Sequence, residues 1–182
     1  MPDEFLTDFI SERSVPNVGA EANRQAVERF LVESKGYHRT DISVDFEVTI
    51  QVAGSPYLAR VDLLVSIPCE KRSGASVAVM AIKCAAGSIG SREREVLAAA
   101  RVVNEGYQIP LAVATDGKTA IVLDTVSGKK IGAGMDSIPS KNEALEKLKS
   151  LELQPLPKER LEREKLIFRA YDIENVNVQR NI

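Results

Sequence analysis

Hydrophobic and polar residues alternate from residue 42 to residue 50, which is the pattern of a strand with one buried face. The turn residues 53–56 follow, and residues 57–67 are predicted to form the returning strand of a hairpin. After a polar loop at 68–76, residues 77–83 are nearly all apolar, which is typical of a central strand covered on both faces. This part of the chain therefore predicts three consecutive strands.

A helical period appears on both sides of these strands. Apolar residues recur at helical spacing over residues 21–34, and Gly36 stands where a left-handed C-terminal cap belongs. A second helix is predicted over residues 91–104, with Ser91 as its N-terminal cap. The three strands are therefore expected to lie between two helices in the chain.

Two further strands are predicted after the second helix, over residues 109–115 and 119–124. Asp116 and Gly117 lie between them, and this dipeptide is a strong hairpin signal. The predicted order is therefore helix, three strands, helix, two strands. This order indicates an α/β domain with a mixed central sheet.

The last part of the chain has the sequence pattern of helices without strands. Ser140 and Glu143 form a capping box that opens a short helix, and a highly charged helix is predicted from residue 157 to about residue 171. We expect this charged helix to pack along one edge of the core, and the alternative is a partner-binding arm. The predicted organisation is an N-terminal lead-in, a core domain and a helical C-terminal extension, over residues 1–18, 19–134 and 135–182 respectively.

Composition narrows the functional classes. The chain has 182 residues, 44% of them hydrophobic, and 24 basic against 26 acidic side chains. One domain with a sizeable core fits this length, and the near-neutral charge argues against a strongly basic nucleic-acid binder. One histidine and two cysteines, Cys69 and Cys84, are too few for a histidine metal centre, a zinc site or a disulfide framework.

The chain has no apolar run near the roughly 18–20 residues that a membrane span needs. Its first residues are acidic, where a signal peptide would be basic. We therefore expect a cytoplasmic protein without membrane association.

Asp62 and Lys83 are the candidate chemical residues. Each places a charge next to apolar strand residues, where an unpaired charge is costly. Neighbouring strands can bring a carboxylate and an ammonium together at a Mg²⁺-assisted phosphodiesterase site. They can equally form a partly buried structural ion pair, which is the commoner case. Spacing alone leaves both interpretations open.

Several short segments together resemble the N-terminal domain of type I restriction enzyme R subunits. These segments are residues 21–25, 30–37, 42–46, 60–65, 81–85 and 107–117. Such domains belong to the PD-(D/E)XK nuclease superfamily, whose core of helix, three strands, helix and strand has the predicted order. The resemblance covers roughly residues 19–130 and implies a restriction-endonuclease-like α/β fold. We expect a mixed central sheet of about five strands flanked by helices.

The resemblance assigns roles to individual residues. Asp62 matches the metal-binding aspartate, Lys83 the catalytic lysine, and Glu21 the acidic residue of the first helix that often assists the metal. The chain departs from the family at Ala81, where the (D/E)-x-K motif requires a carboxylate. Some superfamily members carry this acid on the following helix, where Glu95 is available in this chain.

The same helix departs from the family in a second way. A Gln-x-x-x-Tyr motif is usual there, and the best register places Glu95 and Ala99 at its two positions. Glu93 is a further candidate for the migrated acid. The alternative for Glu95 is an exposed, solvated helix residue that pairs locally with Arg92 or Arg94, because charges alternate in this segment.

Three functional hypotheses follow. The preferred one is a catalytically impaired nuclease-fold protein that acts as a nucleic-acid-associated or protein-interaction module, with Mg²⁺ bound weakly or not at all. The second is an active Mg²⁺-dependent DNA endonuclease that uses Asp62, Lys83, Glu21 and a migrated acid at Glu95. The third is a purely structural subunit. DNA and other protein subunits are the candidate partners.

Overall fold

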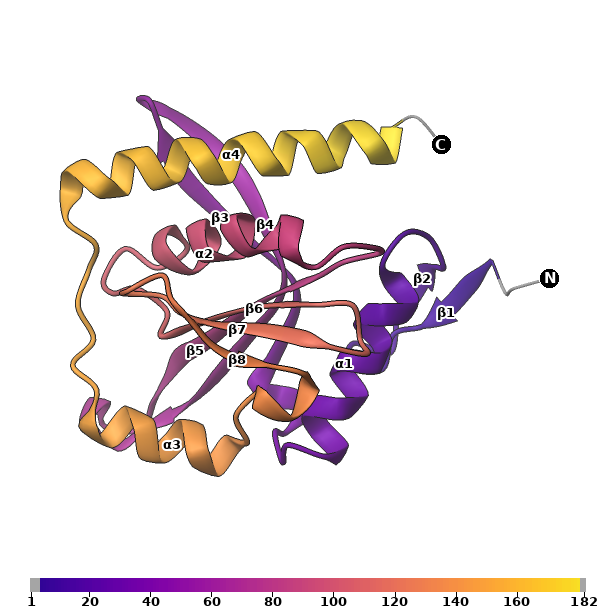
Figure 1. Cartoon of the computed structure of the whole chain (residues 1–182), viewed down its shortest axis with the longest axis horizontal. Coiled ribbons are helices and arrows are strands. Elements are labelled where there is room, and N and C mark those ends of the chain that lie inside the picture. Colours follow the sequence, from indigo (N-terminus) through magenta and orange to yellow (C-terminus); the bar gives the residue numbers. More distant parts are fainter. Residues whose placement is uncertain (1–3, 181–182) are drawn as a thin grey trace.

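A six-stranded mixed sheet forms the centre of the computed structural model, which describes residues 4–180 and the side chains of residues 4–171 (Figure 1). Its strands lie side by side in chain order: β3 (Ile42–Val52), β4 (Ser55–Cys69), β5 (Ala75–Cys84), β6 (Leu111–Thr115), β7 (Ala120–Asp124) and β8 (Lys130–Ala133). Only β5 and β6 run parallel, because a helix connects them; the other neighbours are antiparallel.

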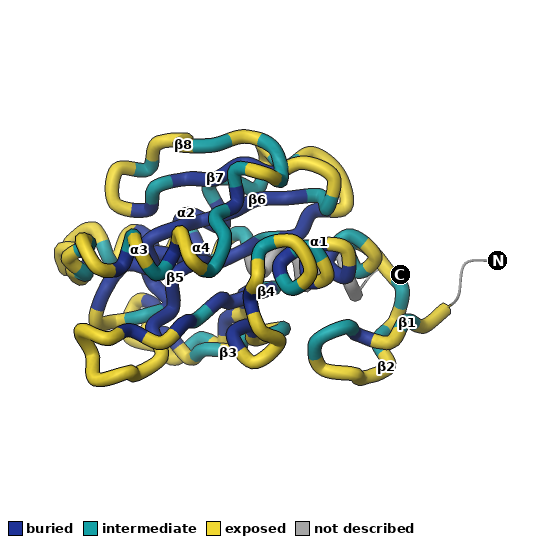
Figure 2. Tube along the Cα trace, turned by 90° about the horizontal axis from the view of Figure 1, so that it is seen from below, coloured by how far each residue is buried: buried dark blue, intermediate teal, exposed yellow. Residues whose placement is uncertain are grey.

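Helices cover both faces of the sheet and give three layers (Figure 1). The helices are α1 (Glu21–Glu33), α2 (Glu93–Val102), α3 (Lys141–Ser150) and α4 (Lys158–Arg180). One buried cluster joins α1 and α3 to the sheet, and a second joins α2 and α4 to the opposite face. The central strands are buried along most of their length, as the dark tube in Figure 2 shows.

The α/β architecture and the predicted order of elements are confirmed. The sheet has a sixth strand, β8, which hydrophobic patterning missed because it is a short edge strand without a buried alternation. The lead-in contains a small hairpin of β1 (Phe5–Thr7) and β2 (Ser14–Pro16). None of the helices in the described part of the chain is long and apolar enough to cross a membrane.

The start of α2 differs from the prediction. A 3₁₀ turn over Gly90–Arg92 precedes the helix, and the Ser91 hydroxyl donates a hydrogen bond to the Ser88 carbonyl instead of capping. Helix α4 packs mainly on α2, also contacts β3 and β4, and extends beyond the predicted end at residue 171. The capping box of Ser140 and Glu143 opens α3 as predicted.

Two backbone irregularities orient the strand residues near the end of β5. Asp45 has a φ of +49°. The buried side chains of β3 pack in the α1 layer before this residue and in the α2 layer after it. The register of β4 and β5 shifts between Val65 and Ser66, which leaves one extra residue in β5. Beyond that shift Ala81 faces the α2 layer, and Lys83, two residues further on, lies on the same side.

Gly117 lies in the turn between β6 and β7, and its substitution tests how closely this turn packs against α1. Gly117 has a φ of +81°, and a Cβ there would lie 3.0 Å from the Asn23 carbonyl oxygen of α1. We expect Gly117→Ala to lower the free energy of unfolding by about 2–4 kcal/mol, because backbone strain and a clash add. Urea denaturation measures the loss.

Gly54→Ala is the matched control. Gly54 has a φ of +82°, but a Cβ added there would meet no atom of the described residues within 4 Å beyond its chain neighbours. It therefore isolates the backbone strain, about 1–2 kcal/mol. Equal losses in both variants would mean that the turn is not pressed against α1.

Candidate functional site

Asp62 on β4 and Lys83 on β5 meet at the end of their antiparallel pairing. The Lys83 Nζ lies 3.2 Å from Asp62 Oδ1, and the backbone N–H of Cys84 donates to Asp62 Oδ2 at 2.8 Å. Both side chains are less than one-fifth exposed. The predicted juxtaposition of Asp62 with Lys83 is therefore present, with both carboxylate oxygens held by donors from one short segment of β5.

Glu95 reaches the same ammonium from the first turn of α2. Its Oε1 lies 3.2 Å from Lys83 Nζ, and its Oε2 lies 3.1 Å from Arg92 Nη1. Glu95 is only 3% exposed, so the prediction of a solvated side chain is wrong, whereas the predicted local pairing with Arg92 is present. The reason is that α2 begins shortly after β5 and lays its first turn over the end of that strand.

The geometry limits how far apart the two carboxylates are. One oxygen of Asp62 and one of Glu95 each lie 3.2 Å from a single nitrogen, so these oxygens are separated by at most twice that distance. Burial acts to lower the pKa of Lys83, but the two carboxylates outweigh it and raise the pKa above its usual value. Lys83 is therefore a stable ammonium between two acids.

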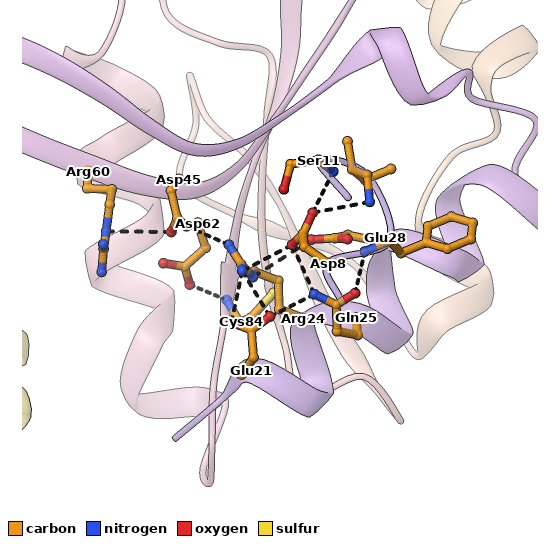
Figure 3. A network of polar contacts seen from close by, with 12 residues as sticks. Asp8, Ser11, Glu21, Arg24, Gln25, Glu28, Asp45, Arg60, Asp62 and Cys84 are labelled. Atoms are coloured by element: carbon orange, nitrogen blue, oxygen red, sulfur yellow. Dashed lines mark hydrogen bonds and ion pairs between the residues drawn. The ribbon is translucent and has the colours of Figure 1, made fainter. Parts of the chain in front are cut away.

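Glu21 belongs to a second cluster, centred on the buried guanidinium of Arg24 (Figure 3). Arg24 Nη2 lies 2.8 Å from Glu21 and 3.2 Å from Asp8, and Nη1 lies 2.8 Å from Asp45. Burial acts to lower the pKa of Arg24, but the pairs with Glu21 and Asp45 raise it. The cluster joins the N-terminal hairpin, α1 and the irregular point of β3.

Gln25 completes this cluster. Its amide nitrogen donates to Glu21 Oε1 at 2.7 Å and to Asp8 Oδ2 at 2.9 Å, while its oxygen accepts the Phe9 N–H at 2.7 Å. The Glu21 carboxylate is thus held by Arg24 and Gln25 together. Sequence reasoning identified Glu21 but missed Asp8, Arg24 and Asp45, since no periodic signal marks polar residues that meet across distant segments.

Glu28 is a fully buried acid in the same region. Arg24 Nε lies 3.7 Å from Glu28 Oε1, and within the described residues neither Glu28 oxygen has a hydrogen-bond partner. Burial, assisted by the negative charge of Asp8, raises the pKa of Glu28 to about 8. The Glu28 carboxyl is therefore protonated at neutral pH, which removes one negative charge from the crowded cluster.

A groove of about 380 Å³ opens onto both clusters. Its walls come from the start of α1, from β3 and β4, and from the end of β5, and Asp62, Lys83 and Glu21 all line it. Arg92 lies at its border and connects it to Glu95. A ligand in this groove would therefore contact Asp62 and Lys83 directly.

The donor set can be tested against the Mg²⁺ that the fold implies. Over residues 4–171 no three histidine, cysteine or acidic side chains are grouped closely enough to hold a metal by themselves. Ala81 is fully buried and supplies no oxygen from its side chain. Mg²⁺ is nevertheless commonly bound through one or two carboxylates together with substrate phosphate and water. Asp62 and Glu95 fit that pattern.

Residues 19–139 match the family model described as the N terminus of the type I restriction enzyme R protein. The match spans about two thirds of the chain. The chain belongs to this family. Neither the curated proteins nor the solved structures contain a significant match. The family region includes Glu21, Asp62, Lys83 and Glu95, and it leaves the N-terminal hairpin with Asp8 outside.

Replacement of Glu28 by glutamine tests the protonated carboxyl. The pKa of Glu28 is about 8 in the folded protein against an ordinary 4.5, so between these values the folded state binds more protons than the unfolded state. Wild-type stability must then fall as pH rises, by up to about 1.4 kcal/mol per pH unit. We expect Glu28→Gln to gain stability relative to the wild type across this window, as measured by thermal unfolding.

Glu143→Gln is a control for which the pH dependence of stability should run in the opposite direction. Hydrogen bonds from Ser140 lower the pKa of the exposed Glu143. Wild-type stability from this group is present at neutral pH and lost as the pH falls, so this variant is weakened most at neutral pH. A Glu28→Gln difference that does not change with pH would contradict a protonated Glu28.

Proposed function

We propose that this protein is a Mg²⁺-dependent DNA phosphodiesterase of the restriction-endonuclease type, in which Glu95 replaces the carboxylate missing at Ala81. The observation that carries the proposal is the convergence of Asp62 and Glu95 on the ammonium of Lys83, with Glu95 almost fully buried. A migrated acid has to reach the Asp62 side of the sheet, and Glu95 does so.

The residues divide the chemistry among them. Asp62 and Glu95 would hold the metal, which when bound supplies Lewis-acid polarisation of the phosphate and a water of lowered pKa. Lys83 keeps its proton, so its Nζ donates hydrogen bonds to the phosphate oxygens and stabilises charge that develops there. Glu21 is held by Arg24 and Gln25 and supports the wall of the groove from α1.

Charge balance links metal binding to DNA binding. Lys83 and Arg92 neutralise Asp62 and Glu95 in the free protein, which leaves little net attraction for a dication. Arg92 is one-third exposed and borders the groove, so a DNA phosphate can draw it away from Glu95. The two carboxylates then carry an excess negative charge, and Mg²⁺ is expected to bind together with DNA.

A second candidate is the catalytically impaired binding module. It is favoured by Ala81, because a fully buried alanine occupies the motif position, and by the complete pairing of the two remaining acids with cations. In this case the three charged side chains form only a structural ion-pair network. Activity measurements separate the two candidates.

Cleavage of plasmid and single-stranded DNA in Mg²⁺ or Mn²⁺ is the direct test. We expect Lys83→Ala to abolish cleavage, because Lys83 stabilises charge on the reacting phosphate, and Glu95→Gln to lower the rate by about 10²-fold or more, because Glu95 holds the metal. Glu93→Gln tests the other candidate acid of the same turn and should keep the activity, since Glu95 makes the ion pair with Lys83. Absence of cleavage in both metals, with DNA binding retained, would support the impaired module instead.

Moving the carboxylate from position 95 to position 81 tests whether Glu95 is the migrated acid. Ala81 and Lys83 lie on the same side of β5, so a carboxylate at position 81 points to the layer that holds Glu95. We expect Glu95→Ala to be inactive and the double variant Ala81→Glu/Glu95→Ala to recover part of the activity.

The single variant Ala81→Glu controls for folding, because it buries an additional acid and should lower the melting temperature. A folded double variant with no recovery would count against Glu95 as the substitute for the motif carboxylate.

A further inference from the structure

Strand β4 presents three groove-lining side chains in a row. Leu58, Arg60 and Asp62 are two residues apart, so they lie on one side of the strand at intervals of about 6.8 Å. The row runs from an apolar side chain through a cation to the carboxylate of the proposed reaction centre. A chain molecule lying along β4 would contact the three in turn.

The apolar members of the groove are unusually exposed. Leu58 is 59% exposed and Val18, from the segment before α1, is 56% exposed. Both line the groove, and they come from different walls. Single exposed apolar residues are ordinary, but two at one groove provide an apolar contact surface. None of the described residues that line the groove is aromatic, so aliphatic contacts replace stacking platforms there.

Arg60 is available for a phosphate. Its side chain is 45% exposed, and its ion pair with Asp45 is 3.7 Å long, which is beyond hydrogen-bond distance. Arg24 and Lys83, in contrast, are held tightly by carboxylates. Arg60 is therefore the groove cation that can turn most easily toward a ligand.

The depth of the groove limits which DNA can enter. Asp62 and Lys83 line the groove and are mostly buried, and its volume is about 380 Å³. This value lies near the lower end of the range of small-molecule pockets, about 300–1,000 Å³. A space of this size accommodates about one nucleotide, and the low exposure of Asp62 and Lys83 requires a phosphate to enter the groove to reach them.

From this arrangement the geometry points to unpaired DNA as the substrate: the Leu58–Arg60–Asp62 row and Val18 receive one strand whose bases are free, at a single-stranded segment, a frayed end or a loop. Arg60 binds the phosphate next to the one that reaches Asp62, and Leu58 packs against the neighbouring base. This inference rests on the proposed phosphodiesterase function for its chemistry, but the strand preference can be measured by binding alone.

The test measures binding in Ca²⁺, so that cleavage does not consume the DNA. Fluorescence anisotropy compares one oligonucleotide as a single strand, as a blunt duplex, and as a duplex with an unpaired loop. We expect the single strand and the looped duplex to bind about tenfold more tightly than the blunt duplex. A 2-aminopurine base in the single strand should change its fluorescence on binding, since Leu58 alters its stacking.

Matched variants assign the contacts. Leu58→Ser should weaken single-strand binding by about tenfold and remove the 2-aminopurine response, as expected for loss of one base contact. Val126→Ser is the control, because Val126 is as exposed but lies beside β7 and β8, at the other end of the sheet. Arg60→Ala should reduce the slope of log K for single-strand binding against log salt concentration by about 0.7, which is the value for one single-strand phosphate. Lys130→Ala should leave this slope unchanged.

The outcomes are distinguishable. Blunt-duplex binding as tight as single-strand binding, or a Leu58→Ser variant that binds like the wild type, overturns the strand preference even if Mg²⁺-dependent cleavage is found. Selective single-strand binding without cleavage in any metal overturns the proposed phosphodiesterase and leaves the strand preference standing. Selective binding with cleavage of the same unpaired DNA supports both.

Discussion

Neutralisation of buried charge governs the region where α1, β3, β4 and β5 meet. A charge removed from water is tolerated only when it is paired or loses its charge. Arg24 satisfies this requirement for Glu21 and Asp8, while Lys83 does so for Asp62 and Glu95. Glu28 meets the requirement differently, by keeping its proton. The groove is therefore built from two cation-centred clusters, one on each of its sides.

These pairings also explain the backbone around the groove. Asp45 adopts a left-handed conformation that costs energy for a residue with a Cβ, and its carboxylate is held 2.8 Å from Arg24. At this point β3 transfers its buried side from one layer to the other. The distal half of the β3–β4 hairpin then contacts α4, and Leu58 and Arg60 are brought to the wall of the groove.

The sequence was sufficient for the elements whose side chains repeat. Period-two and helical patterns predicted β3, β4, β5 and the helices, and adjacency of antiparallel strands placed Asp62 beside Lys83. The burial of Glu95 could not be predicted, because alternating charges in its segment are also the pattern of a solvated helix. The Arg24 cluster depends on contacts between Asp8, α1 and Asp45, and such contacts leave no periodic mark in the sequence.

The position of Glu95 is electrostatically favourable for a buried carboxylate that pairs with Lys83. It lies in the first turn of α2, where the helix dipole and unpaired N–H groups favour negative charge. Position 81, in contrast, lies within a central strand among apolar neighbours, where an acid has no such support. In the proposed nuclease, an acid at the helix end instead of on the strand keeps the charge near Lys83 and lowers the cost of burying it. Alanine at position 81 then fills the space beneath α2 without adding a second buried charge.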